Sequence, residues 1–351
     1  MKIGIPREVK ILEGRVTLNP IAVNTITQKG HQVFFEKKAG FLSGYSDDEY
    51  QAAGATLVDS AEEVYNSAEL IVKVKEPQPD ELKLLREDQV LFSYLHLAAA
   101  PELTQKLLNI GLTAVAFETV TVENRLPLLA PMSDIAGRIA VQVGTHLLHQ
   151  PLGGRGILLG GVEGTEKGHV VILGGGTAGT AATIIASALG ANVQVFDPST
   201  EKRQRLESLN RNVIARPPHI DSISGATKQA DLLIGAALIP GAKSPHLVSA
   251  KQVQSMKAGS VVLDISVDQG GCIETTRPTT YDDPTFIWEE VIHFGVTNMP
   301  GAVPRTATQA LSAVLLPYVL QLCESDWQQN PVLASGINVQ NGAVILPALK
   351  Q

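Results

Sequence analysis

The sequence is poor in cysteine and in basic residues. Of its 351 residues only two are cysteines, Cys272 and Cys323, which is too few for a disulfide framework and favours a reducing compartment. Lys and Arg number 28 against 35 Asp and Glu, a formal net charge of −7. Nucleic acids and anionic membranes bind basic surfaces. The composition therefore argues against partners of both kinds.

The sequence also lacks the signals of export and membrane insertion. The charged residues near the start are not followed by the apolar region of a secretory signal. The longest apolar stretches, such as residues 313–320, are far shorter than the roughly 18 residues of a membrane-spanning helix. There are no repeats and no low-complexity tracts. We expect a soluble, cytoplasmic protein with disorder limited to the C-terminal tail.

Glycine is slightly over-represented and unevenly placed. The 31 glycines among 351 residues are about 9 %, against a usual share of about 7 %. A chain of this length is expected to form two domains with full cores. The positions of the glycine clusters are more informative than their number.

The first third of the chain alternates short strands with helices. The strand predictions rest on short runs of β-branched and aromatic residues, and the helix predictions on helical spacing of apolar residues. The predicted strands are 2–5, 32–36, 70–74, 90–95 and 114–117, and the predicted helices are 20–29, 47–53, 80–86 and 101–110. This alternation favours a parallel sheet covered on both faces.

A long helix is predicted from about Ser133 to His149, with Asp134 and Arg138 able to pair on its surface. A second α/β unit follows, ending in a helix over 307–324 that is expected to return to the first domain. The predicted strands of this unit are 169–173, 192–196, 213–215, 232–235, 260–265 and 292–296, with a helix over 177–189. Six strands with helical crossovers are typical of a dinucleotide-binding domain.

The strongest motif is Gly174-Gly-Gly-Thr-Ala-Gly179, which fits G-x-G-x-x-G directly between a predicted strand and a predicted helix. Gly174 permits the tight turn, and Gly176 lets the backbone approach a pyrophosphate. Gly179 allows close helix–strand packing, and the helix N-terminus favours negative charge. The alternative is a structural glycine turn without a ligand.

Asp197 ends the next predicted strand, 18 residues beyond Gly179. A carboxylate at this position accepts hydrogen bonds from the ribose hydroxyls and repels a 2′-phosphate, which favours NAD over NADP. Lys202 and Arg203 weaken that preference, because a cation tolerates the phosphate. A surface Asp without a ligand is the alternative.

Three ionisable residues of the first domain are candidates for substrate chemistry. Arg15 could hold a carboxylate, Lys75 could polarise a carbonyl oxygen, and His96 could transfer protons near neutral pH. Lys75 and His96 each end a predicted strand, where ligands usually bind. Each has a structural alternative: Arg15 a surface ion pair, one of Lys73 and Lys75 a solvated side chain, and His96 a core histidine.

Two polar segments of the second half also follow strands. Asp264 ends a buried strand, and Asp268 lies in the glycine-rich loop beyond it, where the backbone could approach a ligand. Asn298 similarly follows the last predicted strand. These residues would surround a nicotinamide at the carboxyl edge of the sheet, although Asp268 could also be a turn-forming residue.

Taken together, these motifs make the chain resemble the family that comprises bacterial alanine dehydrogenases and the soluble nucleotide-binding part of proton-translocating transhydrogenases. The similarity runs from Met1 to about Leu320. The motifs that carry it are Ile5-Pro-Arg-Glu with Arg15-Val, Lys73-Val-Lys-Glu-Pro77, Tyr94-Leu-His-Leu-Ala98, Pro131-Met-Ser-Asp-Ile-Ala-Gly137, Asp268-Gln-Gly-Gly-Cys272 and Asn298-Met-Pro-Gly-Ala-Val-Pro304.

The resemblance implies an α/β protein with two Rossmann-like, doubly wound parallel-sheet domains and a discontinuous substrate domain. Residues 1–128 with 302–351 would be the substrate domain, and residues 129–301 the NAD-binding domain. The implied activity is reversible NAD-dependent oxidative deamination of L-alanine to pyruvate and ammonium, in a homohexamer. No metal is implied.

The resemblance also assigns roles to residues. Arg15 and Lys75 would bind the substrate, and His96 and Asp268 would handle protons. The implied cofactor-binding residues are Ser133, Gly174, Gly176, Gly179, Asp197, Lys202, Ala237, Leu238, Ile265, Val267, Arg277, Val296, Asn298 and Met299.

The chain departs from the family pattern at two places. Residues 161–168 lack the proline-containing Gly-Val-Pro-Gly loop, and residues 216–220 differ where an adenine contact would fall, so no residue is assigned there. A transhydrogenase subunit is one rival interpretation, although its Arg-Ala-Gln loop and its proline-type segment in place of Tyr94-Leu-His-Leu97 are missing. A non-catalytic NAD-binding protein is the other.

Overall fold

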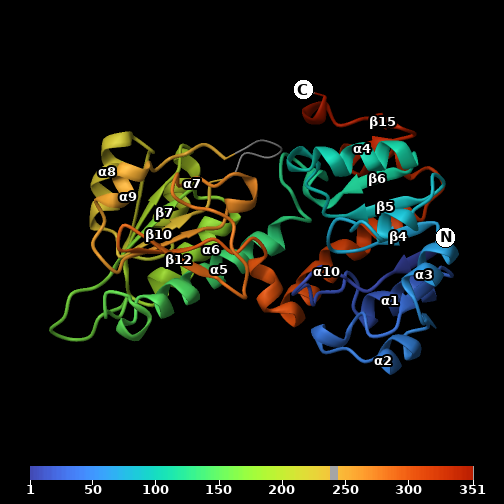
Figure 1. The fold of residues 1–351 in the computed structure, drawn as a ribbon, viewed down its shortest axis with the longest axis horizontal. Coiled ribbons are helices and arrows are strands. Elements are labelled where there is room, and N and C mark those ends of the chain that lie inside the picture. Colours follow the sequence, from blue (N-terminus) through green and yellow to red (C-terminus); the bar gives the residue numbers. More distant parts are fainter. Residues whose placement is uncertain (238–243, 351) are drawn as a thin grey trace. The chain divides into compact units, whose positions relative to one another are not determined.

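The computed structural model describes residues 1–237 and 244–350. The chain divides into two compact units, each built around its own sheet (Figure 1). Unit 1 comprises Met1–Met132 and Gly301–Gln351, and unit 2 comprises Ser133–Pro300. The assignment of substrate binding to 1–128 with 302–351, and of NAD binding to 129–301, stays a prediction about what each unit does.

Unit 1 contains an eight-stranded sheet in the order β15-β14-β6-β5-β4-β1-β2-β3. Strands β1 to β6 are parallel, whereas β14 pairs antiparallel with β6 and β15 antiparallel with β14. The strands are β1 (Lys2–Ile5), β2 (Gln32–Glu36), β3 (Thr56–Val58), β4 (Leu70–Val72), β5 (Val90–Ser93), β6 (Thr113–Ala116), β14 (Ile337–Gln340) and β15 (Ala343–Val344). The helices are α1 (Pro20–Gln28), α2 (Asp47–Ala52), α3 (Ala61–Ser67), α4 (Pro101–Ile110), α10 (Pro304–Leu322) and α11 (Pro331–Ser335).

Both ends of the chain build unit 1. Helix α10, orange-red in Figure 1, runs among the blue N-terminal elements, and two backbone amides near α1 donate to its side chains. Val16 N lies 3.0 Å from Thr308 Oγ1, and Asn19 N lies 3.0 Å from Ser312 Oγ. The expectation of a loose C-terminal tail is wrong, because β14 and β15 extend the sheet. Neighbouring β6 is wholly buried, so β14 covers an edge that would otherwise expose unpaired backbone.

Unit 2 contains a seven-stranded sheet in the order β12-β13-β11-β10-β7-β8-β9. All neighbours are parallel except the edge strand β12, which pairs antiparallel with β13. The strands are β7 (His169–Leu173), β8 (Asn192–Phe196), β9 (Val213–Arg216), β10 (Leu232–Gly235), β11 (Val261–Asp264), β12 (Thr285–Trp288) and β13 (Val291–Phe294). The helices are α5 (Ala130–Leu147), which begins in the last residues of unit 1, α6 (Thr177–Ala188), α7 (Thr200–Glu207), α8 (Ile220–Gln229) and α9 (Ala250–Gln254).

Glycines let the long helix α5 pack closely inside unit 2. A Cβ at Gly137 would lie 2.1 Å from the carbonyl oxygen of Ala178 in α6, and one at Gly144 would lie 2.6 Å from the side chain of Leu232 in β10. Only glycine fits such approaches. The predicted surface pair on α5 is confirmed, with Arg138 Nε 3.1 Å from Asp134 Oδ1.

The α/β fold class is confirmed, and the predicted strands are found within two residues of their expected bounds. The helix expected over 80–86 is wrong, since only a 3₁₀ turn, Glu81–Lys83, forms there. The short strands β3 and β12 were not predicted. Within the described residues, no helix combines the length and the apolar character that a membrane crossing requires.

Candidate active site

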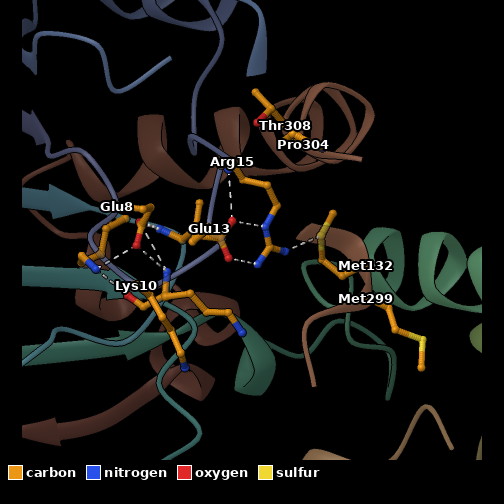
Figure 2. Close-up of polar contacts among 12 residues, drawn as sticks. Glu8, Lys10, Glu13, Arg15, Met132, Met299, Pro304 and Thr308 are labelled. Atoms are coloured by element: carbon orange, nitrogen blue, oxygen red, sulfur yellow. Dashed lines mark hydrogen bonds and ion pairs between the residues drawn. The ribbon is translucent and has the colours of Figure 1, made fainter. Parts of the chain in front are cut away.

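Arg15 lies buried in unit 1 in a two-pronged ion pair with Glu13. Its Nε and Nη2 atoms donate to the two carboxylate oxygens over 2.7 and 2.5 Å, and Nη1 lies 3.1 Å from the sulfur of Met132 (Figure 2). Arg15 is 3 % exposed and Glu13 is 4 % exposed, so the predicted alternative of a surface ion pair is wrong. Burial alone would raise the pKa of Glu13, but the guanidinium of Arg15 holds this pKa below its usual value.

The loop that carries Arg15 is fastened to helix α10. The hydroxyl of Ser43 donates to the carbonyl of Gly14 over 2.8 Å and lies 2.8 Å from the hydroxyl of Thr308. Val16, next to Arg15, donates to the same Thr308. The position of Arg15 is therefore fixed by residues almost 300 positions further along the chain.

Lys73 and Lys75 are both buried, so the expectation that one of them is solvated is wrong. Lys73 Nζ lies 3.1 Å from Glu8 and 3.2 Å from Glu81, and it donates to the carbonyl of Lys75 over 3.0 Å. Glu8 in turn accepts the backbone amides of Val74 and Lys75. We call Glu8, Lys73 and Glu81 the buried charge cluster. This cluster holds the backbone that presents Lys75.

Lys75 differs electrostatically from Lys73. Burial alone would lower the pKa of Lys73, but Glu8 and Glu81 raise it. For Lys75, burial lowers the pKa and the nearby positive charge of Arg15 lowers it further. A bound carboxylate near Arg15 and Lys75 would relieve this repulsion. The pair is therefore suited to an anionic substrate.

His96 follows β5 in a left-handed backbone conformation, with φ of 49°. Its amide donates to Glu118 over 2.6 Å, and its ring stacks on Tyr94 with centroids 6.0 Å apart. The residue is half-buried, which argues against a core histidine. Non-glycine residues rarely adopt this conformation, and such strain is concentrated at functional sites.

The glycine motif of unit 2 forms the turn between β7 and α6. Gly174 has φ of 101°, and a Cβ there would lie 2.6 Å from the carbonyl of Ala236. A Cβ at Gly179 would lie 1.8 Å from the carbonyl of Gly174. At Gly176 a Cβ would meet no atom within 4 Å. The turn thus requires Gly174 and Gly179, while the open space at Gly176 fits the approach of a dinucleotide pyrophosphate.

Asp197 lies at the end of β8 beside this turn and is buried. One carboxylate oxygen accepts the amide of Gly175 over 2.8 Å, and the other accepts the amide of Ser199 over 2.8 Å. Lys202 Nζ is 3.8 Å away. Arg203 donates to the carbonyl of Asp197, so it is tied to the backbone of the strand end.

Asp268 lies on the 3₁₀ turn Val267–Gln269, which begins two residues after the end of β11, and is exposed. Among the other predicted cofactor residues, Ser133, Ala237, Ile265 and Asn298 are half-buried, whereas Val267, Val296 and Met299 are buried. Arg277 is exposed, with its guanidinium 4.3 Å from the ring centre of Phe286. Leu238 lies outside the described residues.

Sequence reasoning missed the acids that support these groups. Glu8, Glu13, Glu81 and Glu118 were not proposed, yet each contacts the segment of a candidate residue. Glu13 had a detectable signal, because it lies two residues before Arg15. Glu8 and Glu118 had none, since they are distant in sequence from Lys73 and from His96. Among the described residues no group of three His, Cys, Asp or Glu side chains could hold a metal ion.

Comparison with known proteins decides the family. The family description "Alanine dehydrogenase/PNT, N-terminal domain" matches residues 4–136, and "Alanine dehydrogenase/PNT, C-terminal domain" matches residues 140–347. The chain belongs to this family. Its C-terminal domain in the family description extends through α10 and β14, which the structure places in unit 1.

Individual relatives support the same family assignment. The alanine dehydrogenase of Methanococcus maripaludis is 48 % identical over 99 % of this chain and 95 % of its own length. A solved L-alanine dehydrogenase superposes with a TM-score of 0.95 at 50 % identity, covering 100 % of this chain and 98 % of its own. A solved transhydrogenase from Sinorhizobium meliloti superposes with a TM-score of 0.84 at 25 % identity, covering 99 % of this chain and 100 % of its own. The resemblance seen in the sequence is confirmed, and the dehydrogenase branch is favoured.

Proposed function

We propose that this protein catalyses the reversible reaction L-alanine + NAD⁺ + H₂O ⇌ pyruvate + NH₄⁺ + NADH + H⁺. The observation that carries the proposal is the buried pair of cations, Arg15 and Lys75, close to the stacked rings of Tyr94 and His96. Similarity to alanine dehydrogenases over nearly the whole chain supports it. The reaction draws on unit 1 for substrate binding and on unit 2 for the nucleotide.

Arg15 binds the substrate carboxylate. Glu13 accepts from the Nε and Nη2 donors, and the positive charge of the guanidinium attracts the substrate carboxylate. Glu13 also prevents the guanidinium from rotating. Lys75 donates to the oxygen on C2 of the substrate, where its positive charge stabilises developing negative charge.

Gly174, Gly176 and Gly179 would hold the pyrophosphate of NAD⁺ and Asp197 its ribose, and the nucleotide would supply the acceptor for the hydride of the alanine α-carbon. The remaining proposed cofactor contacts are Ser133, Lys202, Ala237, Leu238, Ile265, Val267, Arg277, Val296, Asn298 and Met299. The carboxylate of Asp197, already accepting the amide of Gly175, would repel the 2′-phosphate of NADP. We therefore propose NAD as the cofactor.

His96 acts as the general acid–base. Loss of the hydride leaves an iminium at C2, and His96 takes a proton from the water that adds to this carbon. His96 returns this proton to the nitrogen of the carbinolamine. Collapse then breaks the C–N bond, His96 takes the hydroxyl proton, and ammonia leaves. Asp268 stabilises the positive charge of the iminium and positions ammonia in the reverse direction.

The decisive assay is NADH consumption by the purified protein with pyruvate and ammonium. Activity without any partner supports the proposal. A transhydrogenase subunit or a non-catalytic binding protein would show none, and absence of consumption with every 2-oxo acid would remove the dehydrogenase function.

His96→Asn tests the acid–base role. Asn tolerates the left-handed backbone, so folding should persist while kcat falls by about 10²–10⁴-fold. His31→Asn in the same unit is the control and should retain full activity. Near-normal turnover of His96→Asn would reject the role.

Asp197→Ala tests the cofactor preference. Because the mutation removes the negative charge at the ribose position, the ratio of activity with NADP to activity with NAD should rise by about tenfold. Loss of the bond to Gly175 should also weaken NADH binding. An unchanged ratio would contradict the assigned role.

We also propose a homohexamer in the cytoplasm, with L-alanine, pyruvate and ammonium as its small-molecule partners and no nucleic-acid partner. The free thiols of Cys272 and Cys323 are consistent with a reducing compartment. Sedimentation analysis of the purified protein measures the oligomeric state directly, and a monomer would refute the hexamer.

A further inference from the structure

Asp264 is a fully buried carboxylate at the end of β11, with 0 % exposure. Isolated buried carboxylates are unfavourable, and neutral donors lower that cost. Burial raises the pKa of Asp264, and the hydrogen bonds that it accepts oppose this rise. The proposed mechanism gives Asp264 no contact with substrate or nucleotide, so its hydrogen bonds require an explanation.

The donors to Asp264 come from both ends of the loop that carries Asp268. The amide of Ser266, at the start of this loop, donates to Oδ1 over 2.9 Å. At its end, the amides of Cys272 and Ile273 donate to Oδ2 over 2.8 and 3.1 Å. The hydroxyl of Thr276 also donates to Oδ2, over 2.9 Å, which makes four N–H and O–H donors, and the thiol of Cys272 lies 3.8 Å from Oδ1.

The loop itself is closed around this carboxylate. Gly271 donates to the carbonyl of Ser266 over 3.0 Å, so residues 266–271 form a compact turn with Asp268 at its exposed side. Gly271 has φ of 72°, and a Cβ there would lie 2.9 Å from Oδ2 of Asp264. The glycine is required because the backbone turns directly over the buried carboxylate.

We infer that Asp264 is a positioning residue that sets the place of Asp268 by fastening both ends of loop 266–273. This inference rests on the proposed role of Asp268. The bonds to Asp264 hold the backbone at Ser266, Cys272 and Ile273, and the backbone between these residues carries Asp268. The four neutral groups that donate to the Asp264 carboxylate hold the loop backbone in one position.

Asp264→Asn is the principal test. The amide offers one acceptor oxygen and an NH₂ group, so at least one of the four donors would face another donor. Displacement of a catalytic group by about 1 Å costs up to about 10²-fold in rate, and we expect kcat to fall by about this factor. Asp231→Asn is the matched control. Asp231 is a buried acid before β10 that accepts the amide of His169, and its variant should keep kcat.

A double-mutant cycle with Asp268→Asn separates positioning from general stability. If Asp264 acts through Asp268, the double variant turns over no more slowly than the slower single variant. Multiplicative losses would overturn the inference. Thr276→Val, which removes one donor, gives a milder variant for the same cycle if Asp264→Asn does not fold.

Hydrogen exchange tests the loop independently of activity. In Asp264→Asn, the amides of Ser266, Cys272 and Ile273 should exchange at least tenfold faster, while those of β7 and β8 keep their protection. Unchanged exchange in the loop would refute the positioning role. Faster exchange in a protein that never consumes NADH would instead refute the proposed function and leave the fastening of the loop intact.

Discussion

The two units stabilise their candidate sites by opposite means. In unit 1 the candidate groups are charged side chains paired inside the core, such as Arg15 with Glu13 and Lys73 with Glu8. In unit 2 they are backbone groups shaped by glycines, with Asp197 and Asp264 fixed mainly by neutral amide donors. A buried charge is costly to leave unpaired, whereas a glycine turn is sensitive to volume. Unit 1 is therefore vulnerable to loss of charge, and unit 2 to addition of atoms.

The largest effect is expected for Lys73→Met. It removes the cation shared by Glu8 and Glu81, whose side chains are 3 % and 4 % exposed. Breaking a buried ion pair typically costs about 3–5 kcal/mol, and urea denaturation should show a loss of this size for unit 1. Asp134→Asn in the exposed pair on α5 is the control and should cost about 0–1 kcal/mol. Equal losses would remove the contrast between buried and exposed charge.

An intermediate effect is expected for Gly176→Ala in unit 2. The backbone there has φ of −69° and room for a Cβ, so folding should be unaffected. The added methyl would occupy the space proposed for the pyrophosphate, and NADH affinity should fall by about tenfold, or about 1.4 kcal/mol. Fluorescence titration measures this affinity.

Gly225→Ala is the matched control for that experiment. Gly225 lies inside α8, also with open space around its Cβ position, so alanine should stabilise the protein by about 0.4–1 kcal/mol and leave NADH binding unchanged. If both variants bind NADH like the parent, the turn Gly174–Gly179 has only a structural role.

The smallest change in stability is expected for Lys75→Met. Burial and Arg15 lower the pKa of Lys75 in the folded state. Between this pKa and the pKa of the unfolded state, the unfolded protein binds more protons than the folded protein. The stability of the protein therefore rises with pH over that range. Below the folded pKa the buried charge is a constant penalty, which methionine removes. We expect an increase of about 1–3 °C in Tm at neutral pH, given about 2–4 °C per kcal/mol in a unit of this size.

The gain from Lys75→Met should shrink as pH rises toward the unfolded pKa of lysine, and activity should be lost at every pH. Lys83→Met is the control, because the Lys83 side chain is 74 % exposed and its removal should shift Tm little. A lower Tm for Lys75→Met would mean that Lys75 stabilises the fold, contrary to the direction of its pKa.

Local patterns in the sequence were enough to predict the fold class and the candidate residues. The G-x-G-x-x-G turn between a strand and a helix, the acid at the end of the next strand, and most parallel strands depend on residues close together in the chain. Arg15, Lys75, His96 and Asp268 could be chosen because their charge stands out at strand ends and in glycine-rich loops. The identity of these four candidate residues was therefore accessible from the sequence alone.

Only the tertiary structure decided which charges are paired and which edges are covered. Lys73 and Lys75 look alike in the sequence, but Glu8 and Glu81 fall beside one of them and Arg15 beside the other. The tail of the chain completes the first sheet as β14 and β15 because the edge of β6 requires a partner. Most of these contacts join residues tens to hundreds of positions apart. Their energies also depend on burial, which a local pattern does not encode.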